Sequence, residues 1–510
     1  MKSTILTSLL LLFILAANSQ TKVILHTDQA KDVISKDIYG HFAEHLGHCI
    51  YGGIYVGEDS EIPNVRGFRD DVVRALKDIQ IPVLRWPGGC FADTYHWKDG
   101  IGPRENRPSI VNVHWGGVTE DNSFGTHEFL DFCDLIGAEA YININVGSGT
   151  VQEASEWVEY VSSSNKSPMT ELRKKNGREE PWNVKYWGIG NENWGCGGNM
   201  TPEYYADIYK QFATFTRGNL YKIACGPSDF DYNWMDVVMQ KTARNPGLVQ
   251  GVSLHYYTIQ TGNWSDKGNA TGFGEKEWFE TINKTLEMEN LVTRHSTIMD
   301  KYDPQKRVGM IVDEWGNWFN VEEGTNPGFL FQQNSLRDAM VAAINLNIFN
   351  NHADRVKMTN IAQMVNVLQS VILTKDEEMV LTPTYYVFKM YNVHQDATLV
   401  PSNISTENYT YNSKSVPAVN VSSSIKDGVL SITLCNLNPN KAQKVELEIT
   451  GDSYAEASAS VITSDKLDAY NDFGKNEDVN IRNFEVDKPK NGKLTVELPS
   501  KSVVLVQLKQ

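Results

Sequence analysis

The stretch YWGIGNENW, residues 186–194, decides the fold expected for this chain of 510 residues. It begins as an apolar run typical of a buried parallel strand and ends in a loop that carries Glu192. A second stretch, MIVDEWGNW at 310–318, repeats the pattern with Glu314. A glutamate is costly to bury inside a core strand, but at the carboxyl end of a barrel strand it reaches a cleft shared with the other strand ends. The two stretches therefore predict a barrel with a pair of glutamates at its mouth, as glycosidic bond hydrolysis requires.

The organisation of residues 36–392 supports this prediction, because short Val- and Ile-rich runs alternate there with longer amphipathic stretches. Eight strand candidates can be counted, at 38–42, 82–86, 140–146, 184–189, 222–225, 251–255, 308–312 and 356–361. An open doubly wound sheet is the rival, but it normally carries a G-x-G-x-x-G loop after an early strand, and WPGGC at 86–90 lacks that spacing. The fold class predicted is α/β, with a (β/α)8 catalytic barrel.

Residues 393–510 differ in composition from the barrel region. They are rich in Ser, Thr, Asn and Val, and runs such as LSITLC at 430–435 alternate between apolar and polar positions. This pattern predicts a C-terminal all-β sandwich. The short run VILH at 23–26, within residues 20–35, is expected to pair with that sandwich.

The formal net charge of −16, from 47 basic and 63 acidic residues, argues against a nucleic-acid partner. Phosphates would be repelled by such a surface. The 12 Trp and 22 Tyr residues suit the faces of sugars, which stack on aromatic rings. Composition therefore favours a carbohydrate ligand.

The amino terminus predicts a cleavable signal peptide over residues 1–19. Lys2 precedes an apolar run at 5–17, and small residues follow up to Ser19. The run is shorter than the roughly 20 residues that span a bilayer, so no membrane span is expected. We expect a secreted or periplasmic protein. Its six cysteines show no zinc-finger spacing, and their pairing cannot be read from the sequence.

Five motifs, taken in order, resemble the α-L-arabinofuranosidases of glycoside hydrolase family 51: IYGHFAEHLG at 38–47, LRWPGGCF at 84–91, WGIGNENW at 187–194, VDEW at 312–315 and NIAQMV at 360–365. The resemblance spans nearly all of the chain after residue 19. It implies a (β/α)8 barrel with a β-sandwich, a retaining mechanism, no metal or other cofactor, and frequent homo-oligomers. The implied partner is an arabinose-containing plant polysaccharide or oligosaccharide.

The resemblance also assigns roles to the charged residues. Glu192, after the fourth strand, corresponds to the acid/base, and Glu314, after the seventh, to the nucleophile. Arg85, at the end of the second strand, is expected to point towards Glu314 and hold it ionised. Tyr257 in SLHYY at 253–257 matches a tyrosine that donates a hydrogen bond to the nucleophile. His255 in the same run is either a supporting site residue or a satisfied core histidine.

Further residues correspond to those that surround the furanose in this family. Polar residues expected to bind its hydroxyls are Glu44, Cys90, Asn191 and Gln363, and the expected aromatic walls are Trp115 and Trp318. Such polar groups discriminate strongly, because a sugar lacking the matching hydroxyl leaves them buried and unpaired. Cys90 could instead be a buried thiol or half of a disulfide. An isolated Trp is more often part of core packing.

Three alternatives compete with this interpretation. HFAEH at 41–45 reads H-x-x-E-H, a zinc-peptidase signature, but that chemistry requires a helix, and the preceding residues indicate a strand. An endo-acting glucanase or a xylosidase could use the same barrel, since the fold and the carboxylate pair do not decide the sugar. A non-catalytic carbohydrate-binding protein is disfavoured because both glutamates are present.

Overall fold

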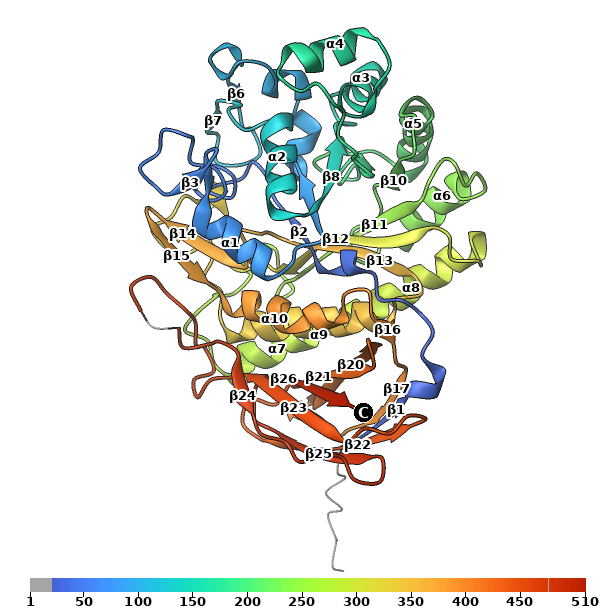
Figure 1. The fold of residues 1–510 in the computed structure, drawn as a ribbon, viewed down its shortest axis with the longest axis vertical. Coiled ribbons are helices and arrows are strands. Elements are labelled where there is room, and N and C mark those ends of the chain that lie inside the picture. Colours follow the sequence, from blue (N-terminus) through green and yellow to red (C-terminus); the bar gives the residue numbers. More distant parts are fainter. Residues whose placement is uncertain (1–20, 476) are drawn as a thin grey trace, which may run out of the picture.

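The structure is a computed structural model that describes residues 21–475 and 477–510 (Figure 1). Its centre is a closed barrel of eight parallel strands: β2 (Gly40–Phe42), β5 (Val83–Trp86), β8 (Glu139–Ile144), β9 (Tyr186–Ile189), β10 (Tyr221–Ala224), β11 (Gly251–Thr258), β12 (Gly309–Asn317) and β13 (Val356–Ile361). Each strand pairs with its neighbours in chain order, and β13 closes the barrel onto β2. The predicted (β/α)8 barrel is confirmed.

The barrel interior is filled by side chains rather than by solvent. Six buried residues from six strands pack together there: Val83, Tyr141, Tyr186, Ile223, Ile311 and Met358. Every residue of β5, β9 and β12 is buried, as expected for strands that have side chains on one face and helices on the other. The barrel interior is therefore a packed core below the carboxyl ends of the strands.

Ten α-helices connect and surround the strands: α1 (Asp70–Asp78), α2 (Thr126–Ile136), α3 (Val151–Ser162), α4 (Pro168–Lys175), α5 (Pro202–Phe215), α6 (Tyr232–Thr242), α7 (Glu275–Thr285), α8 (Glu287–Tyr302), α9 (Leu336–Asn351) and α10 (Pro383–Tyr391), counted over the described ranges. Side-chain caps begin several of them. Thr150 accepts a hydrogen bond from the backbone at the start of α3, and Ser335 forms a capping box with Asp338 at the start of α9.

Shorter elements lie between these helices and strands. The 3-10 helices are η1 (Thr27–Gln29), η2 (Lys36–Tyr39), η3 (Cys90–Thr94), η4 (Trp97–Gly100), η5 (Arg104–Asn106), η6 (Pro327–Phe329) and η7 (Asn392–His394). The small two-stranded sheets pair β3 (Asn64–Val65) with β4 (Phe68–Arg69), β6 (Ile110–Val111) with β7 (Thr119–Glu120), β14 (Ile372–Lys375) with β15 (Glu378–Leu381), and β18 (Asn408–Tyr411) with β19 (Lys414–Pro417).

The C-terminal part forms two larger sheets around a second core. A six-stranded sheet contains β16 (Thr398–Leu399), β20 (Val419–Lys426), β21 (Val429–Asn436), β23 (Glu456–Ile462), β24 (Arg482–Phe484) and β26 (Ser502–Lys509). A four-stranded sheet contains β1 (Thr21–His26), β17 (Ser402–Ser405), β22 (Gln443–Thr450) and β25 (Lys493–Leu498). Strand β1 pairs antiparallel with β17 and parallel with β22, so the first described strand belongs to the C-terminal sheets (Figure 1).

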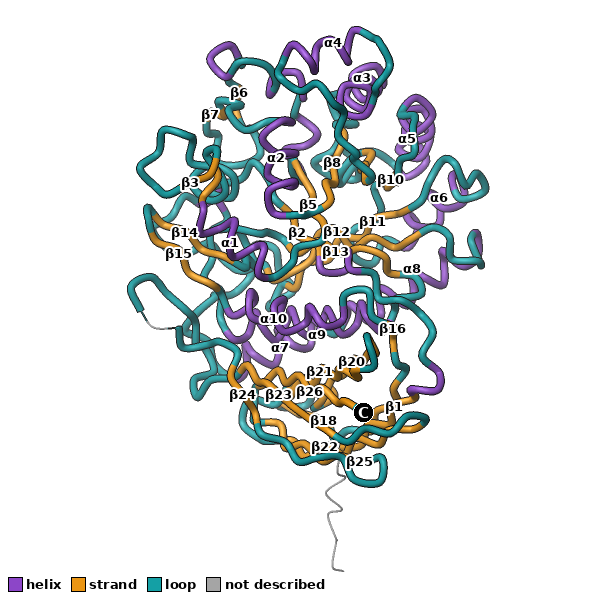
Figure 2. The backbone as a smooth tube through the Cα atoms, in the orientation of Figure 1, coloured by secondary structure: helices purple, strands orange, loops and turns teal. Residues whose placement is uncertain are grey.

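Helices α7, α9 and α10 lie between the barrel and the sheets (Figure 2). Helix α9 is buried along almost its whole length. From it, Asn347 donates a 2.7 Å hydrogen bond to the side chain of Asn420 in β20, and from α7 the indole of Trp278 donates to the carbonyl of Leu437 at 2.9 Å. Across the described ranges, none of the helices has the length and apolar character that a membrane crossing needs.

Candidate active site

A cavity of about 290 Å³ opens at the carboxyl ends of the barrel strands. Nine of the eleven residues singled out in the sequence line it: Glu44, Cys90, Trp115, Glu192, His255, Tyr257, Glu314, Trp318 and Gln363. The other two, Arg85 and Asn191, are buried and bonded to each other, with the guanidinium Nη2 donating to the Asn191 amide oxygen at 2.6 Å. The barrel therefore brings together side chains that are up to 319 residues apart in the chain.

The two glutamates approach each other in this cavity. One carboxyl oxygen of Glu192, one of Glu314 and a ring nitrogen of His255 all lie within 4.8 Å of one another. Glu192 follows β9 and has a φ of 40°, a backbone conformation that is strained for a residue with a side chain. Its side chain is 18% exposed, whereas that of Glu314, within β12, is 7% exposed. Glu192 is thus the more accessible of the two carboxyls.

Glu314 is held by two donors. Arg85 Nη1 donates to its Oε1 at 2.8 Å, and the Tyr257 hydroxyl donates to its Oε2 at 2.9 Å. Burial lowers the pKa of Arg85, but the charges of Asp313 and Glu314 raise it above its ordinary value, so the guanidinium stays cationic. A buried cation and a hydroxyl donor both stabilise the ionised form of Glu314.

His255 bridges the acidic groups rather than packing in an apolar core. Its Nδ1 lies 2.9 Å from Glu192 Oε1 and its Nε2 lies 3.1 Å from Asp313 Oδ1. Burial lowers its pKa, but the charge of Glu314, the hydrogen bonds to Asp313 and Glu192 and the charge of Asp313 together raise it to about 10. The imidazole is therefore protonated at neutral pH and donates from both nitrogens.

The carboxyl of Glu192 has a raised pKa. Burial is the largest cause, and the negative charge of Glu314 adds to it, while the hydrogen bond and charge of His255 and the charge of Arg85 act in the opposite direction. The two glutamates consequently differ in their environment. Glu314 is bonded to a cation and a hydroxyl donor, whereas Glu192 retains a proton to higher pH than an ordinary glutamate does.

Glu44 also lines the cavity, and its carboxylate accepts hydrogen bonds from four N–H donors. Its Oε1 accepts from the backbone of Gly89 and Phe91 and from the indole of Trp115 at 2.9 to 3.1 Å, and its Oε2 accepts from Gln363 at 2.8 Å. Burial and the charge of Glu314 raise the pKa of Glu44 to about 7, against these donors. Oε2 accepts only one of these hydrogen bonds, so it retains acceptor capacity for a hydroxyl.

Gly89 permits this close assembly. A Cβ atom added there would lie 2.9 Å from Glu314 Oε1, closer than side chains tolerate. The glycine in the WPGGC stretch therefore leaves room for the carboxylate of Glu314 beside Glu44.

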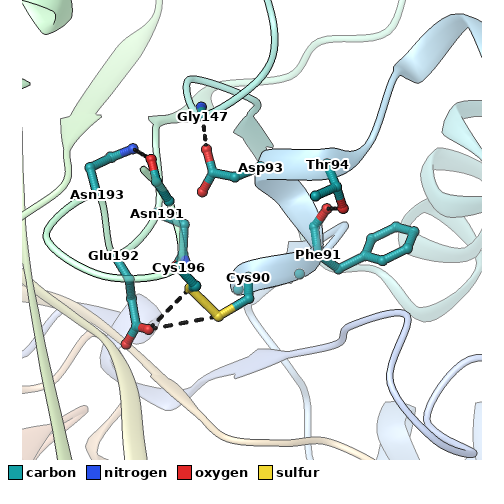
Figure 3. Close-up of a disulfide and its surroundings, with 12 residues drawn as sticks. Cys90, Phe91, Asp93, Thr94, Gly147, Asn191, Glu192, Asn193 and Cys196 are labelled. Atoms are coloured by element: carbon teal, nitrogen blue, oxygen red, sulfur yellow. Dashed lines mark hydrogen bonds between the residues drawn. A yellow bond between two sulfur atoms is a disulfide. The ribbon is translucent and has the colours of Figure 1, made fainter. Parts of the chain in front are cut away.

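Cys90 forms a disulfide with Cys196, which is the third of the possibilities left open for it (Figure 3). The bond joins η3, after β5, to the loop that follows Glu192. The sulfurs of Cys90 and Cys196 lie 3.9 and 3.5 Å from Glu192 Oε2. A disulfide sulfur carries no hydrogen, so these are van der Waals contacts that pack against the carboxyl. The disulfide consequently restricts where Glu192 can move.

The H-x-x-E-H stretch lies on β2 and the following turn rather than on a helix, and its side chains point into three environments. His41 packs against Phe388 with ring centroids 4.6 Å apart. His45 Nε2 accepts a hydrogen bond from the Trp86 indole at 3.1 Å, whereas Glu44 faces the cavity. This arrangement does not resemble the two imidazoles on one helical face that the zinc signature needs.

Sequence reasoning missed Asp313, the neighbour of Glu314. Its carboxylate accepts from the Tyr141 hydroxyl at 2.7 Å and faces both Arg85 and His255. Consecutive strand residues usually point to opposite faces, but the register of β12 against β13 shifts between Val312 and Trp315. The pair of adjacent acids was the only available sign, and alternation argued against it.

The chain matches known families over most of its length. The family model described as "Alpha-L-arabinofuranosidase 1 domain" matches residues 75–258, and the one described as "Alpha-L-arabinofuranosidase C-terminal domain" matches residues 313–502. An "Intracellular exo-alpha-L-arabinofuranosidase" of Bacteroides ovatus is 52% identical over 97% of this chain and 96% of its own length. "Alpha-L-arabinofuranosidase C" of Emericella nidulans is 33% identical over 89% and 91%.

The first of these relatives corrects one expectation. The apolar run at 5–17 predicts a secreted or periplasmic protein, but the Bacteroides ovatus relative, which is similar over nearly the whole chain, is named intracellular. The expectation of export is therefore wrong by this comparison. It depended on a short hydrophobic segment alone, and that segment lies outside the described residues.

A solved structure agrees with the sequence comparisons. The "GH51 arabinofuranosidase from Xanthomonas axonopodis pv. citri" superposes with a TM-score of 0.94 at 47% identity, covering 96% of this chain and 100% of the other. The barrel, the sheets and the paired glutamates at the strand ends are the features expected for such an enzyme. The chain belongs to the α-L-arabinofuranosidases of glycoside hydrolase family 51.

Proposed function

We propose that this arabinofuranosidase removes terminal non-reducing α-L-arabinofuranosyl residues, one at a time, from arabinan, arabinoxylan or oligosaccharides derived from them. The proposed mechanism is double displacement with retention. The observation that supports it is the close approach of the two carboxyl groups. One carboxyl oxygen of Glu192, one of Glu314 and a ring nitrogen of His255 lie within 4.8 Å of one another. Retaining glycosidases hold their carboxyl groups about 5 to 5.5 Å apart, whereas inverting enzymes need about 6.5 to 9.5 Å to admit a water.

In the first step, Glu314 attacks the anomeric carbon. Arg85 and Tyr257 each hold one of its carboxylate oxygens, and a lone pair of one of these oxygens forms the new C–O bond. The glycosidic C–O bond breaks, and its electron pair goes to the departing oxygen. That oxygen takes the proton of Glu192, which the raised pKa keeps in place.

In the second step, Glu192 acts as a base. The negative charge of Glu314 is one cause of the raised pKa of Glu192, and it disappears once Glu314 is esterified. The pKa of Glu192 then falls, helped by protonated His255 at 2.9 Å. Glu192 accepts a proton from water, the water oxygen bonds to the anomeric carbon, and Glu314 departs as a carboxylate. Both residues regain their starting forms.

The remaining residues are assigned to binding the sugar. Glu44 and Gln363, which are hydrogen-bonded to each other, present polar atoms to the cavity. Asn191 uses its oxygen for Arg85, and its amide nitrogen has only the Cys196 sulfur at 4.0 Å, so it is the group of this residue left for a hydroxyl. A cavity of about 290 Å³ suits one monosaccharide, which supports release of single terminal residues.

The test has two parts. Proton NMR of early product should show the α-anomer of arabinofuranose first, because two inversions restore the starting configuration. Glu192→Ala should lose about 10²- to 10⁴-fold on an arabino-oligosaccharide but much less on an aryl arabinofuranoside with an acidic phenol, which needs little protonation. Azide should restore part of the lost rate on the aryl substrate.

Glu171→Ala is the matched control, because Glu171 lies exposed on α4, away from the cavity. It should behave as wild type on both substrates. An equal loss for Glu192→Ala on both substrates would remove Glu192 from the acid role, and early appearance of the β-anomer would replace retention by inversion.

A further inference from the structure

Asp93 is a buried carboxyl group that the proposed chemistry does not use. It lies on η3, the same short helix that carries Cys90, and the residue is only 3% exposed. Figure 3 shows its side chain between Gly147 on one side and the segment from Asn191 to Asn193 on the other. Because the burial of an ionisable group is costly, a carboxyl in this position needs a physical explanation.

One side of Asp93 holds the turn that follows β8. Its Oδ1 accepts hydrogen bonds from the backbone N–H groups of Val146 at 3.0 Å and Gly147 at 2.7 Å. A Cβ atom added at Gly147 would lie 2.8 Å from the Cβ atom of Asp93 and 3.2 Å from the carbonyl oxygen of Gly197. The turn after β8 therefore packs at one point against both Asp93 and the loop that follows β9.

The other side of Asp93 faces the loop after β9, which carries Glu192. A Cβ atom added at Gly197 would lie 2.8 Å from Asp93 Oδ2 and 2.0 Å from the carbonyl oxygen of Asn191. The backbone of Asn191 is also one of the groups that lower the pKa of Asp93. Asp93 is therefore in contact with both ends of segment 191–197.

Segment 191–197 is a compact turn around Glu192. The carbonyl of Glu192 accepts from the backbone N–H of Gly195 at 2.7 Å and of Gly197 at 3.1 Å, and the Asn193 side chain donates to the carbonyl of Gly197 at 2.8 Å. Since Glu192 has a φ of 40°, its conformation is strained and depends on the contacts around it. A shift at either end of the turn would consequently move the Glu192 carboxyl.

The disulfide is a further attachment of this turn to η3. It joins Cys90 to Cys196, but a single covalent link leaves the turn free to rotate about that link. Asp93 adds contacts at Asn191 and Gly197. Three separate points of attachment define the orientation of the turn, whereas one point does not.

The nucleophile is held by other residues. Glu314 lies within β12, and its carboxylate accepts from Arg85 and from Tyr257. Neither of these hydrogen bonds involves Asp93. Loss of the Asp93 side chain should therefore disturb the group that protonates the leaving oxygen more than the group that attacks the sugar.

We propose that Asp93 is a positioning residue for the acid/base, which holds the turn of Glu192 against η3 and against the turn after β8. The proposal rests on the proposed function, because it takes Glu192 as the proton donor to the leaving group. Asp93 does not touch the substrate. It acts by keeping the Glu192 carboxyl within reach of the departing oxygen, where a displacement of about 1 Å can cost about 10²-fold in rate.

The experiment compares Asp93→Ala with Asp93→Asn. For each variant, kcat/KM is measured on an arabino-oligosaccharide and on an aryl arabinofuranoside with an acidic phenol. Asp93→Ala should lower the oligosaccharide-to-aryl ratio of kcat/KM by about tenfold to a hundredfold, because only the oligosaccharide needs a well-placed acid. If Asp93→Ala does not fold, Asp93→Ser takes its place and should show the same fall.

Asp93→Asn should keep the ratio within about threefold of the wild type. Burial raises the pKa of Asp93 to about 7, although backbone hydrogen bonds and the charge of Arg85 lower it, so an uncharged form is accessible at neutral pH. The amide oxygen of Asn can still accept from Val146 and Gly147. A fall as large as that of Asp93→Ala would therefore overturn the positioning role.

Asp303→Ala is the matched control for a purely structural effect. Asp303 is also buried, and its Oδ2 accepts from the backbone N–H of Val308 at 2.7 Å, but it lies after α8 at the amino end of β12. Urea unfolding should show a loss of stability in both alanine variants, whereas Asp303→Ala should leave the ratio of kcat/KM unchanged.

An equal loss on both substrates in Asp93→Ala, or no loss on either, would overturn the proposal, as would a fall in the ratio for Asp303→Ala. Failure of the proposed function gives a different result. If Glu192→Ala itself lost the same factor on both substrates, the acid role would be wrong. If Glu192→Ala discriminated between the substrates and Asp93→Ala did not, only the positioning role of Asp93 would be wrong.

Discussion

Replacement of His255 by Phe should move the alkaline limit of activity to higher pH. The imidazole donates to Glu192 Oε1 at 2.9 Å, and its hydrogen bond and charge both lower the pKa of that carboxyl. Phe keeps the ring volume but removes the donor and the charge. Glu192 should therefore hold its proton more strongly, and the acid form needed for the first step should persist further into the alkaline range.

The size of the shift follows from the bond that is lost. A hydrogen bond to a charged group contributes about 1.5 to 3 kcal/mol, and each 1.36 kcal/mol corresponds to about one pKa unit. The apparent pKa of the alkaline limb of the kcat/KM profile should thus increase by about one to two units. In the wild type, His255 stays protonated through neutral pH, because its own pKa is raised to about 10. The shift would therefore report Glu192 and not the histidine.

The assay is the pH profile of kcat/KM on an arabino-oligosaccharide, whose poor leaving group requires the acid. His127→Phe is the control, since His127 of α2 bonds to Tyr160 of α3 and does not line the active-site cavity. An alkaline limb that stays in place or moves to lower pH would refute the reasoning.

The pH dependence of the free energy of unfolding gives a second measure of the replacement of His255 by Phe. The folded-state pKa of His255 is raised from 6.5 to about 10, so its protonated form contributes stability that is complete below 6.5 and lost as pH rises through about 10. The free energy of unfolding of the wild type should fall between these values, and His255→Phe should lack this component of the fall.

Two further perturbations test the buried framework. Arg85→Met should lower the free energy of unfolding by about 3 to 5 kcal/mol and remove most activity, because the carboxylate of Glu314 remains buried without its cation; urea unfolding and kcat/KM on an aryl arabinofuranoside measure both. Replacing Cys90 and Cys196 together by Ala should lower the free energy of unfolding by up to about 4 to 5 kcal/mol, since the bridge closes a segment with a separation of 106 residues. Unchanged unfolding with urea in either variant would contradict the corresponding prediction.

The sequence determined the architecture and the location of the chemistry. Eight apolar runs separated by amphipathic stretches fit either a closed barrel or an open doubly wound sheet, and the missing G-x-G-x-x-G loop favoured the barrel. In the closed barrel the parallel strands bring their carboxyl ends to a common mouth. Glu192 and Glu314 could be placed there because each follows or ends such a run. The motifs shared with family 51 added the surrounding residues, and the roles assigned to them remain proposals.

Only the tertiary structure decided how those residues interact. The role of His255 depends on a contact with Asp313, 58 residues later in the chain, and local sequence cannot distinguish this from a core histidine. The pairing of Cys90 with Cys196, among six cysteines, equally depends on which loops meet at the barrel mouth. Local patterns reflect burial, whereas pairing and electrostatics depend on distances that arise when separate strands meet.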